Sequence, residues 1–97
     1  MDMEALMAQA QDLQTKISEA QDSLAQMHVK GIAENGSVIV TMTGKYDLIS
    51  VVVRPETLSF GAEMVSKLVA DAYRDAKQKA DALIDKVMSS VTGGLNE

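Results

Sequence analysis

The chain of 97 residues has no cysteine, no tryptophan, one histidine, one proline and only three aromatic side chains. Without cysteine there can be no disulfide and no thiolate metal site. A metal cluster or a nucleophile–base pair also has few components when only one histidine is present. The sequence therefore predicts a protein that is not an enzyme and that uses no cofactor, no metal and no small-molecule substrate.

Long apolar runs are also lacking. The longest near-continuous one, residues 48–53, is far too short to span a bilayer. The first four residues carry no positive region of the kind that begins a signal peptide. We therefore expect a cytoplasmic protein without membrane contact. A chain of this size buries only about two-thirds of its unfolded surface, so a second subunit is a natural way to complete its core.

Basic residues are in the minority, with nine against fourteen acidic residues and a net charge of −5. This balance taken alone argues against a nucleic-acid-binding protein, whose surface is usually basic. The acidic residues are unevenly spread, however. Residues 1–27 hold five of them against one lysine, whereas residues 67–86 hold four against five basic residues.

Two amphipathic helices are predicted, over residues 1–28 and 61–91. The first has an apolar seam with a strict seven-residue repeat, which fits either a coiled-coil seam or a core-facing surface. The second repeats every eleven residues, which keeps a helix nearly straight, although the pattern leaves its continuity open. A frayed tail is expected at 92–97. At 1.5 Å per residue, helices of roughly 35–45 Å must overhang strands of about 20–23 Å.

An antiparallel meander is predicted between the helices, over about 29–54, with strands at about 28–34, 37–43 and 46–54. Asn35-Gly36 indicates a type I′ turn, which needs positive φ at both central residues. Gly44-Lys45 suits a second tight turn of type II′. Pro55 cannot donate to a ladder and ends the third strand. The fold class is thus α+β, an α-β-β-β-α protomer forming one domain over residues 1–97.

The third strand is apolar on both sides. Alternation places Ile49, Val51 and Val53 on one face, with Leu48 and Val52 on the other. A small sheet with helices on one side has only one buried face to offer. We therefore expect an intertwined homodimer whose interface includes these five residues, Leu48, Ile49, Val51, Val52 and Val53.

Four segments in order carry a resemblance to a known family. They are V-x-G at 29–31, G-x-V-x-V-x-M-x-G at 36–44, V-x-V-x-P-x-x-L at 51–58 and L-V-A-D-A-Y-R-D-A at 68–76. Their order and spacing resemble those of the YbaB/EbfC family over nearly the whole chain. The resemblance implies an intimate dimer with projecting helices. It also implies bacterial, nucleoid-associated DNA binding without enzymatic activity, with effects on nucleoid organisation or gene expression.

Double-stranded DNA is accordingly the expected partner, bound with little sequence specificity. The cations expected to contact its phosphates lie in the last helix and are Lys67, Arg74, Lys77, Lys79 and Lys86. The residues alone favour a solvated helix face, with Glu63–Lys67 and Asp75–Lys79 as ordinary i,i+4 pairs, and it is the resemblance that favours DNA. The alternative function is a dimeric scaffold that binds another protein through its overhanging amphipathic helices.

Overall fold

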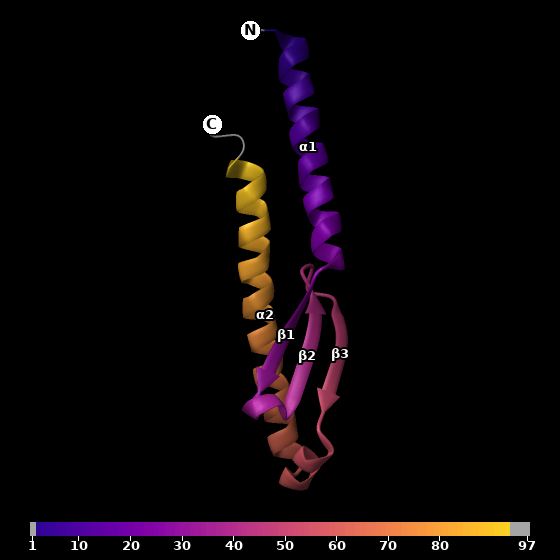
Figure 1. Ribbon diagram of the computed structural model, residues 1–97, viewed down its shortest axis with the longest axis vertical. Coiled ribbons are helices and arrows are strands. Elements are labelled where there is room, and N and C mark those ends of the chain that lie inside the picture. The colour runs from indigo at the N-terminus through magenta and orange to yellow at the C-terminus, as the bar shows by residue number, and fades with distance from the viewer. Residues whose placement is uncertain (1, 94–97) are drawn as a thin grey trace.

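The computed structural model describes residues 2–93 and shows a helix, a three-stranded sheet and a second helix (Figure 1). The predicted α+β class and element order are confirmed. The tail predicted at 92–97 lies largely outside the described residues, and Thr92 and Gly93 belong to the last helix. The elements are α1 Met3–Gln26, β1 His28–Ala33, β2 Val38–Thr43, β3 Leu48–Val53 and α2 Ala62–Gly93, with 3₁₀ segments at Glu34–Gly36 and Pro55–Phe60.

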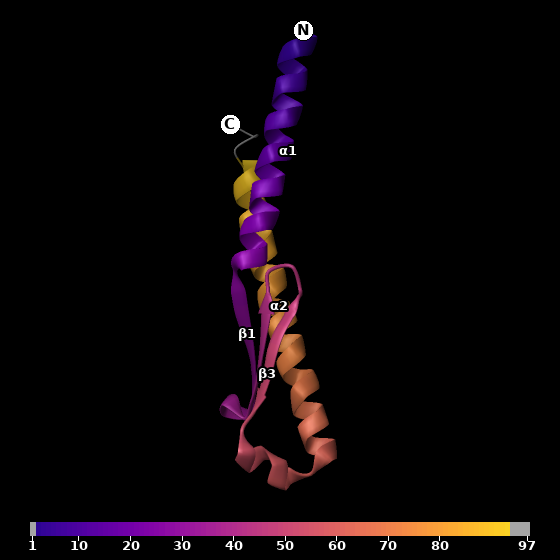
Figure 2. The same cartoon turned by 90° about the vertical axis from the view of Figure 1, so that its right-hand side faces the viewer.

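The molecule is strongly elongated. Its extents are 68 × 20 × 15 Å and its radius of gyration is 19.1 Å, whereas a compact domain of this length would have about 12–13 Å. α2 is one continuous helix of 32 residues. Figures 1 and 2 show its first half lying along the sheet and its second half extending past the sheet beside α1. The predicted overhang of the helices is therefore confirmed.

Small residues let α2 lie directly on the sheet. Ala72, Ala76 and Ala80 are fully buried in a core that also includes Leu68 and the β2 side chains. A Cβ built on Gly31 of β1 would lie 2.7 Å from the Cβ of Ala76. Because the alanines and the glycine leave no side chain between them, the backbones of β1 and α2 can approach closely. α2 contacts β1 and β2.

α1 packs within the chain along only part of its seam. Ala20 and Leu24 are buried near its C-terminal end, whereas Met3, Leu6 and Met7 are exposed. The seam therefore faces the core in its second half and is unpartnered, within the described chain, in its first turns. The Asp2 carboxylate caps the helix by accepting a hydrogen bond from the Glu4 N–H at 3.1 Å.

The helix ends at Gln26, two residues earlier than predicted, and His28 begins β1. Gly44 explains this end, because its N–H lies 3.0 Å from the carbonyl oxygens of both Leu24 and Met27. The Leu24 carbonyl lies in the last turn of the helix, where partners four residues ahead run out, and it also accepts from the N–H of the cap residue Met27 at 3.2 Å. A Cβ on Gly44 would lie 2.8 Å from the Leu24 oxygen, so the residue must be glycine for close approach.

The two turns of the meander differ from each other. At the first, Asn35 has φ 55° and ψ 31° and Gly36 has φ 93°, which confirms the positive φ values predicted at both positions. At the second, the predicted type II′ turn is wrong, because positive φ occurs at Tyr46 (68°) and not at Gly44. The loop there has three residues, with the Thr43 N–H donating to the Asp47 oxygen at 2.9 Å. β3 consequently begins at Leu48 rather than at residue 46.

A bulge in β3 corrects the predicted faces. Val51 pairs with Val40 and Leu48 pairs with Met42, so Ile49 has no partner on β2. The extra residue resets the alternation. Leu48 therefore shares the α2 side of the sheet with Val51, contrary to the strict alternation predicted for this strand. Val52 lies on the opposite face, in a cross-strand row with Ile39 and Ile32.

Candidate nucleic-acid interface

Three of the five predicted DNA-contacting cations lie together on α2. Lys67, Arg74 and Lys77 are spaced by seven and three residues, which places them within about 80° of one another around the helix. All three are exposed. Arg74 donates to Asp71 at 3.1 Å, while Lys67 and Lys77 have no ion-pair partner among residues 2–93. These three residues form the cationic stripe.

Lys79 lies on another side of α2 and is already engaged. Its Nζ is 3.0 Å from the Asp75 carboxylate and donates to the Lys30 carbonyl oxygen at 2.7 Å. The Ile32 N–H donates to the same carboxylate at 2.9 Å. This backbone hydrogen bond, followed by that of Lys79, lowers the pKa of Asp75 from its ordinary value of 3.8. Asp75 and Lys79 thus hold α2 to β1.

Lys86, the fifth predicted cation, is exposed on the second half of α2, beyond the sheet. Asp85 precedes it directly in the sequence, and the neighbouring α1 is strongly acidic. The structure therefore brings Lys67, Arg74 and Lys77 onto one side of the helix and places Lys79 and Lys86 elsewhere.

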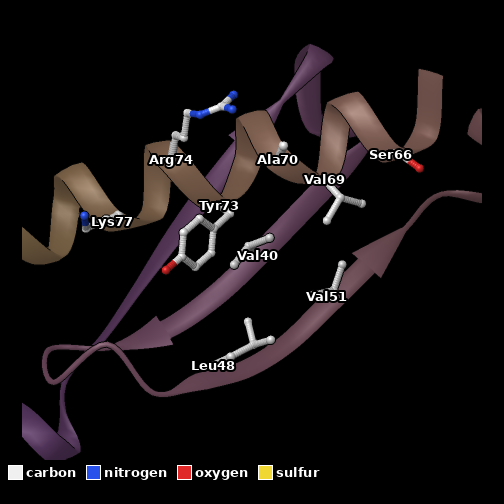
Figure 3. A pocket seen from close by; sticks show the side chains of 9 residues that line it. All are labelled: Val40, Leu48, Val51, Ser66, Val69, Ala70, Tyr73, Arg74 and Lys77. Carbon is white, nitrogen blue, oxygen red and sulfur yellow. The ribbon is translucent and has the colours of Figure 1, made fainter. Parts of the chain in front are cut away.

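An open apolar groove of about 530 Å³ runs between α2 and β3. Figure 3 shows Tyr73 and Val69 reaching from α2 toward the strands, with Leu48 and Val51 on the β3 side and Arg74 and Lys77 on the helix. The groove exists because α2 lies over β1 and β2 and leaves β3 uncovered.

The predicted dimer-interface residues fall into four settings. Leu48 and Val51 are exposed in the groove, and Val52 is exposed on the opposite face. Ile49 is exposed at the bulge. Val53 is half-buried and packs against the core of its own chain. Four of the five are therefore available for contact with a partner.

Charge divides the molecule along its length. The sheet end, residues 28–80, has seven basic and six acidic residues. The helical arm, residues 2–27 and 81–93, has two basic and seven acidic residues. The net charges are +1 and −5. Electrostatic repulsion of a polyanion is therefore stronger at the helical arm than at the sheet end.

The sequence did not indicate two contacts that join the sheet to α2. The i,i+4 pairing of Asp75 and Lys79 was predicted and is confirmed, but their hydrogen bonds to β1 span more than 40 residues. The Tyr46 hydroxyl donates to the Asp81 carboxylate. This hydrogen bond raises the pKa of Tyr46 from its ordinary value of 10.0. No local pattern distinguishes these pairs from ordinary surface residues.

Residues 2–93 hold neither a metal-ligand cluster nor a membrane-spanning helix. That part of the chain has no group of three or more histidine, cysteine, aspartate or glutamate residues that could hold a metal ion. It also has no helix with the length and apolar character needed to cross a membrane.

Comparison with known proteins gives the family. The sequence profile of the YbaB/EbfC DNA-binding family matches residues 1–95. The chain belongs to the YbaB/EbfC family. A nucleoid-associated protein of Bordetella avium is 41% identical over 90 residues, which are 93% of this chain and 83% of that protein. Another, of Bradyrhizobium diazoefficiens, is 39% identical over 95 residues, 97% and 90% of the two chains.

The YbaB/EbfC fold is also seen in a solved structure. An uncharacterized protein of Helicobacter pylori matches with a TM-score of 0.68 at 13% identity, covering 81% of this chain and 93% of that one. At this identity the likeness concerns the fold alone. The resemblance expected from segments 29–31, 36–44, 51–58 and 68–76 is therefore confirmed at the level of family.

Proposed function

We propose that this YbaB/EbfC protein binds double-stranded DNA as a homodimer, with little sequence specificity, and acts in the bacterial nucleoid without catalysing a reaction. The single observation that carries the proposal is the cationic stripe of Lys67, Arg74 and Lys77, exposed at the sheet end of an otherwise acidic molecule. Such side chains contact phosphates, which position a protein on DNA but do not read its sequence. Effects on nucleoid organisation or gene expression would follow from this binding.

The homodimer is supported by the exposed apolar side chains of β3. Leu48, Ile49, Val51 and Val52 are exposed on a strand that has no charged residue within its bounds. A second copy would bury them and would double the cationic stripe. The number of phosphates contacted would then be about three to six per dimer, because acidic residues such as Asp71 lie among the cations.

A gel-shift titration at increasing salt tests the proposal. Counterion release predicts that the logarithm of affinity falls linearly with the logarithm of salt concentration, with a slope of about −3 to −5 for three to six contacts. Lys77→Ala should weaken binding to all duplex sequences alike and make the slope shallower by about 2 per dimer. Lys16→Ala, which removes the same charge from the helical arm, is the matched control and should leave both affinity and slope unchanged.

A second function has a specific observation in its favour, namely the helical arm with its net charge of −5 and its exposed Met3, Leu6 and Met7. An acidic arm with an unpartnered apolar seam fits a protein partner better than DNA. If the wild-type protein fails to retard duplex DNA even at about 50 mM salt, the scaffold function replaces DNA binding. If Lys77→Ala and Lys16→Ala weaken DNA binding equally, the cationic stripe is not the contact surface.

A further inference from the structure

The first turns of α1 are exposed on all sides. Every residue from 2 to 12 is exposed, and the first half-buried residue of the helix is Leu13. Figures 1 and 2 both show this part of α1 reaching beyond the end of α2. A helix of only about ten residues is marginal in water without tertiary packing. Residues 3–12 therefore form a helical segment that a partner would stabilise.

Apolar side chains lie along one side of this segment. Met3, Leu6, Met7 and Ala10 fall within an arc of roughly 100° around the helix, which is the width of the apolar stripe on a helix that packs against another element. All four are exposed. Methionine is unbranched and polarizable, and it recurs at surfaces that adapt to the shape of a partner. We call these four residues the tip stripe.

The charge around the tip stripe is acidic. Residues 2–12 contain Asp2, Glu4 and Asp12 and no basic residue. Of the seven acidic residues of the helical arm, only Asp12 is in an ion pair within residues 2–93, with Lys16 at 3.2 Å. Glu4 lies about 60° from Met7 around the helix, so it borders the tip stripe. A surface complementary to this one is both apolar and positively charged.

This charge decides among the possible occupants. A second copy would bring another helical arm of net charge −5 against the first, and DNA or an anionic membrane would also be repelled. Helices that lie on membranes carry lysine and arginine on their polar face, whereas residues 2–12 have neither. Amphipathic helices bind partners through anchors at i, i+3, i+4 and i+7, which is the spacing of the tip stripe. A cationic amphipathic helix meets both the apolar and the electrostatic requirement.

We propose that the tip stripe binds a lysine- or arginine-rich amphipathic helix of another protein. The inference rests on the second function described above, gives the chemistry of its partner and places the contact at residues 3–10. The cationic stripe lies on the half of α2 that runs along the sheet, far along the chain from α1. The two ends of the molecule would thus hold different partners, DNA at the cationic stripe and a basic protein at the tip stripe.

The first experiment uses a synthetic peptide of leucine and lysine, with leucine at i, i+3, i+4 and i+7 and a fluorescent label read by anisotropy. Wild type should bind it, and should bind the same peptide with glutamate in place of lysine at least about tenfold more weakly. Met7→Gln should weaken binding by about tenfold, because the complex loses one buried apolar side chain. Met7→Leu should bind like wild type.

Met64→Gln is the matched control, because it makes the same change at an exposed methionine of the sheet end. It should leave the affinity for the peptide unchanged. Since Met7 is exposed, Met7→Gln should fold like wild type, which circular dichroism checks. Equal binding by wild type and Met7→Gln would overturn the tip stripe as the site, and equal binding of the lysine and glutamate peptides would overturn the cationic partner.

The second experiment locates the peptide on the wild-type protein, so it depends on no variant. In methionine methyl spectra the peptide should shift Met3 and Met7 and leave Met64 in place, whereas a shift of Met64 alone would overturn the proposal. Duplex DNA is titrated separately, because a cationic peptide would itself bind DNA. A protein that retards DNA but does not bind the peptide refutes this inference alone. A protein that binds the peptide at the tip stripe without retarding DNA supports this inference and refutes DNA binding.

Discussion

The sheet end and the helical arm differ in how closely they are packed and in their net charge. At the sheet end, α2 approaches the strands so closely that Gly31, Ala72 and Ala76 leave no room for a larger side chain, and the charges nearly balance. In the helical arm, two long helices meet along part of one seam, the first turns of α1 stay exposed, and the net charge is −5. One region is thus fixed by internal packing, and the other presents surface.

The two regions therefore suit different interactions. Internal packing at the sheet end is complete on the α2 side of β1 and β2 and incomplete at β3, so β3 is where the proposed homodimer would gain contacts. The cationic stripe lies on the same half of α2. The helical arm contributes acidic surface and an unpartnered apolar seam, neither of which suits a phosphate backbone.

The two regions should differ most in how much a single substitution lowers the free energy of unfolding. Gly31→Ala would place a Cβ 2.7 Å from the Ala76 Cβ and closer still to the α2 backbone. β1 and α2 would have to move apart, which should cost about 3 kcal/mol, at or above the upper end of ordinary overpacking. The free energy of unfolding is measured by urea denaturation.

Leu6→Ala in the helical arm is the comparison variant and should change the free energy of unfolding by less than about 0.5 kcal/mol, as exposed substitutions do. Equal losses in the two variants would show that the arm is packed as tightly in solution as the sheet end. That result would favour a second copy or another partner covering the arm.

A smaller effect is expected from pH at the contact between α2 and β1. Because the folded-state pKa of Asp75 is lowered below 3.8, its contribution to stability is present above that value and is lost as pH falls through the folded-state pKa. Asp75→Asn should therefore be less stable than wild type at about pH 6, and this difference should shrink as pH falls through the folded-state pKa of Asp75. The difference should be less than about 1 kcal/mol, because the ion pair is exposed.

Asp71→Asn is the control for this prediction. Among residues 2–93, Asp71 pairs only with Arg74 on the helix surface, so removing its charge should cost less than removing that of Asp75 at neutral pH. Protection of the Ile32 amide from hydrogen exchange, followed over the same pH range, gives a direct readout. If protection of Ile32 is independent of both pH and the Asp75 side chain, the hydrogen bond does not form in solution.

Much of the fold could be predicted because, over most of the chain, the local sequence pattern and the tertiary packing favour the same structure. The seven-residue seam of α1, the period-two strands and the Asn35-Gly36 turn gave the element order correctly. The failures occur where tertiary contacts override local preference. Gly44 approaches Leu24 closely and does not adopt the conformation of a type II′ turn. The bulge at Ile49 places Leu48 on the face opposite to the predicted one.

The candidate site was predictable in type but only partly in position. Of the five predicted cations, Lys67, Arg74 and Lys77 lie on one side of α2, as their spacing along a helix requires. The engagement of Lys79 with the Lys30 carbonyl depends on which strand lies beside the helix. That neighbour is set by the register and packing of the sheet, which a spacing of charges along one helix cannot reveal.

The most direct test of the division between sheet end and helical arm uses the methionine methyl groups as nuclear magnetic resonance probes. Met64 is 44% exposed at the start of α2, three residues before Lys67, whereas Met3 and Met7 are 69% and 60% exposed at the tip of α1. On titration with duplex DNA at low salt, we expect the Met64 resonance to shift while those of Met3 and Met7 stay in place. Shifts of Met3 and Met7 with an unmoved Met64 would contradict it.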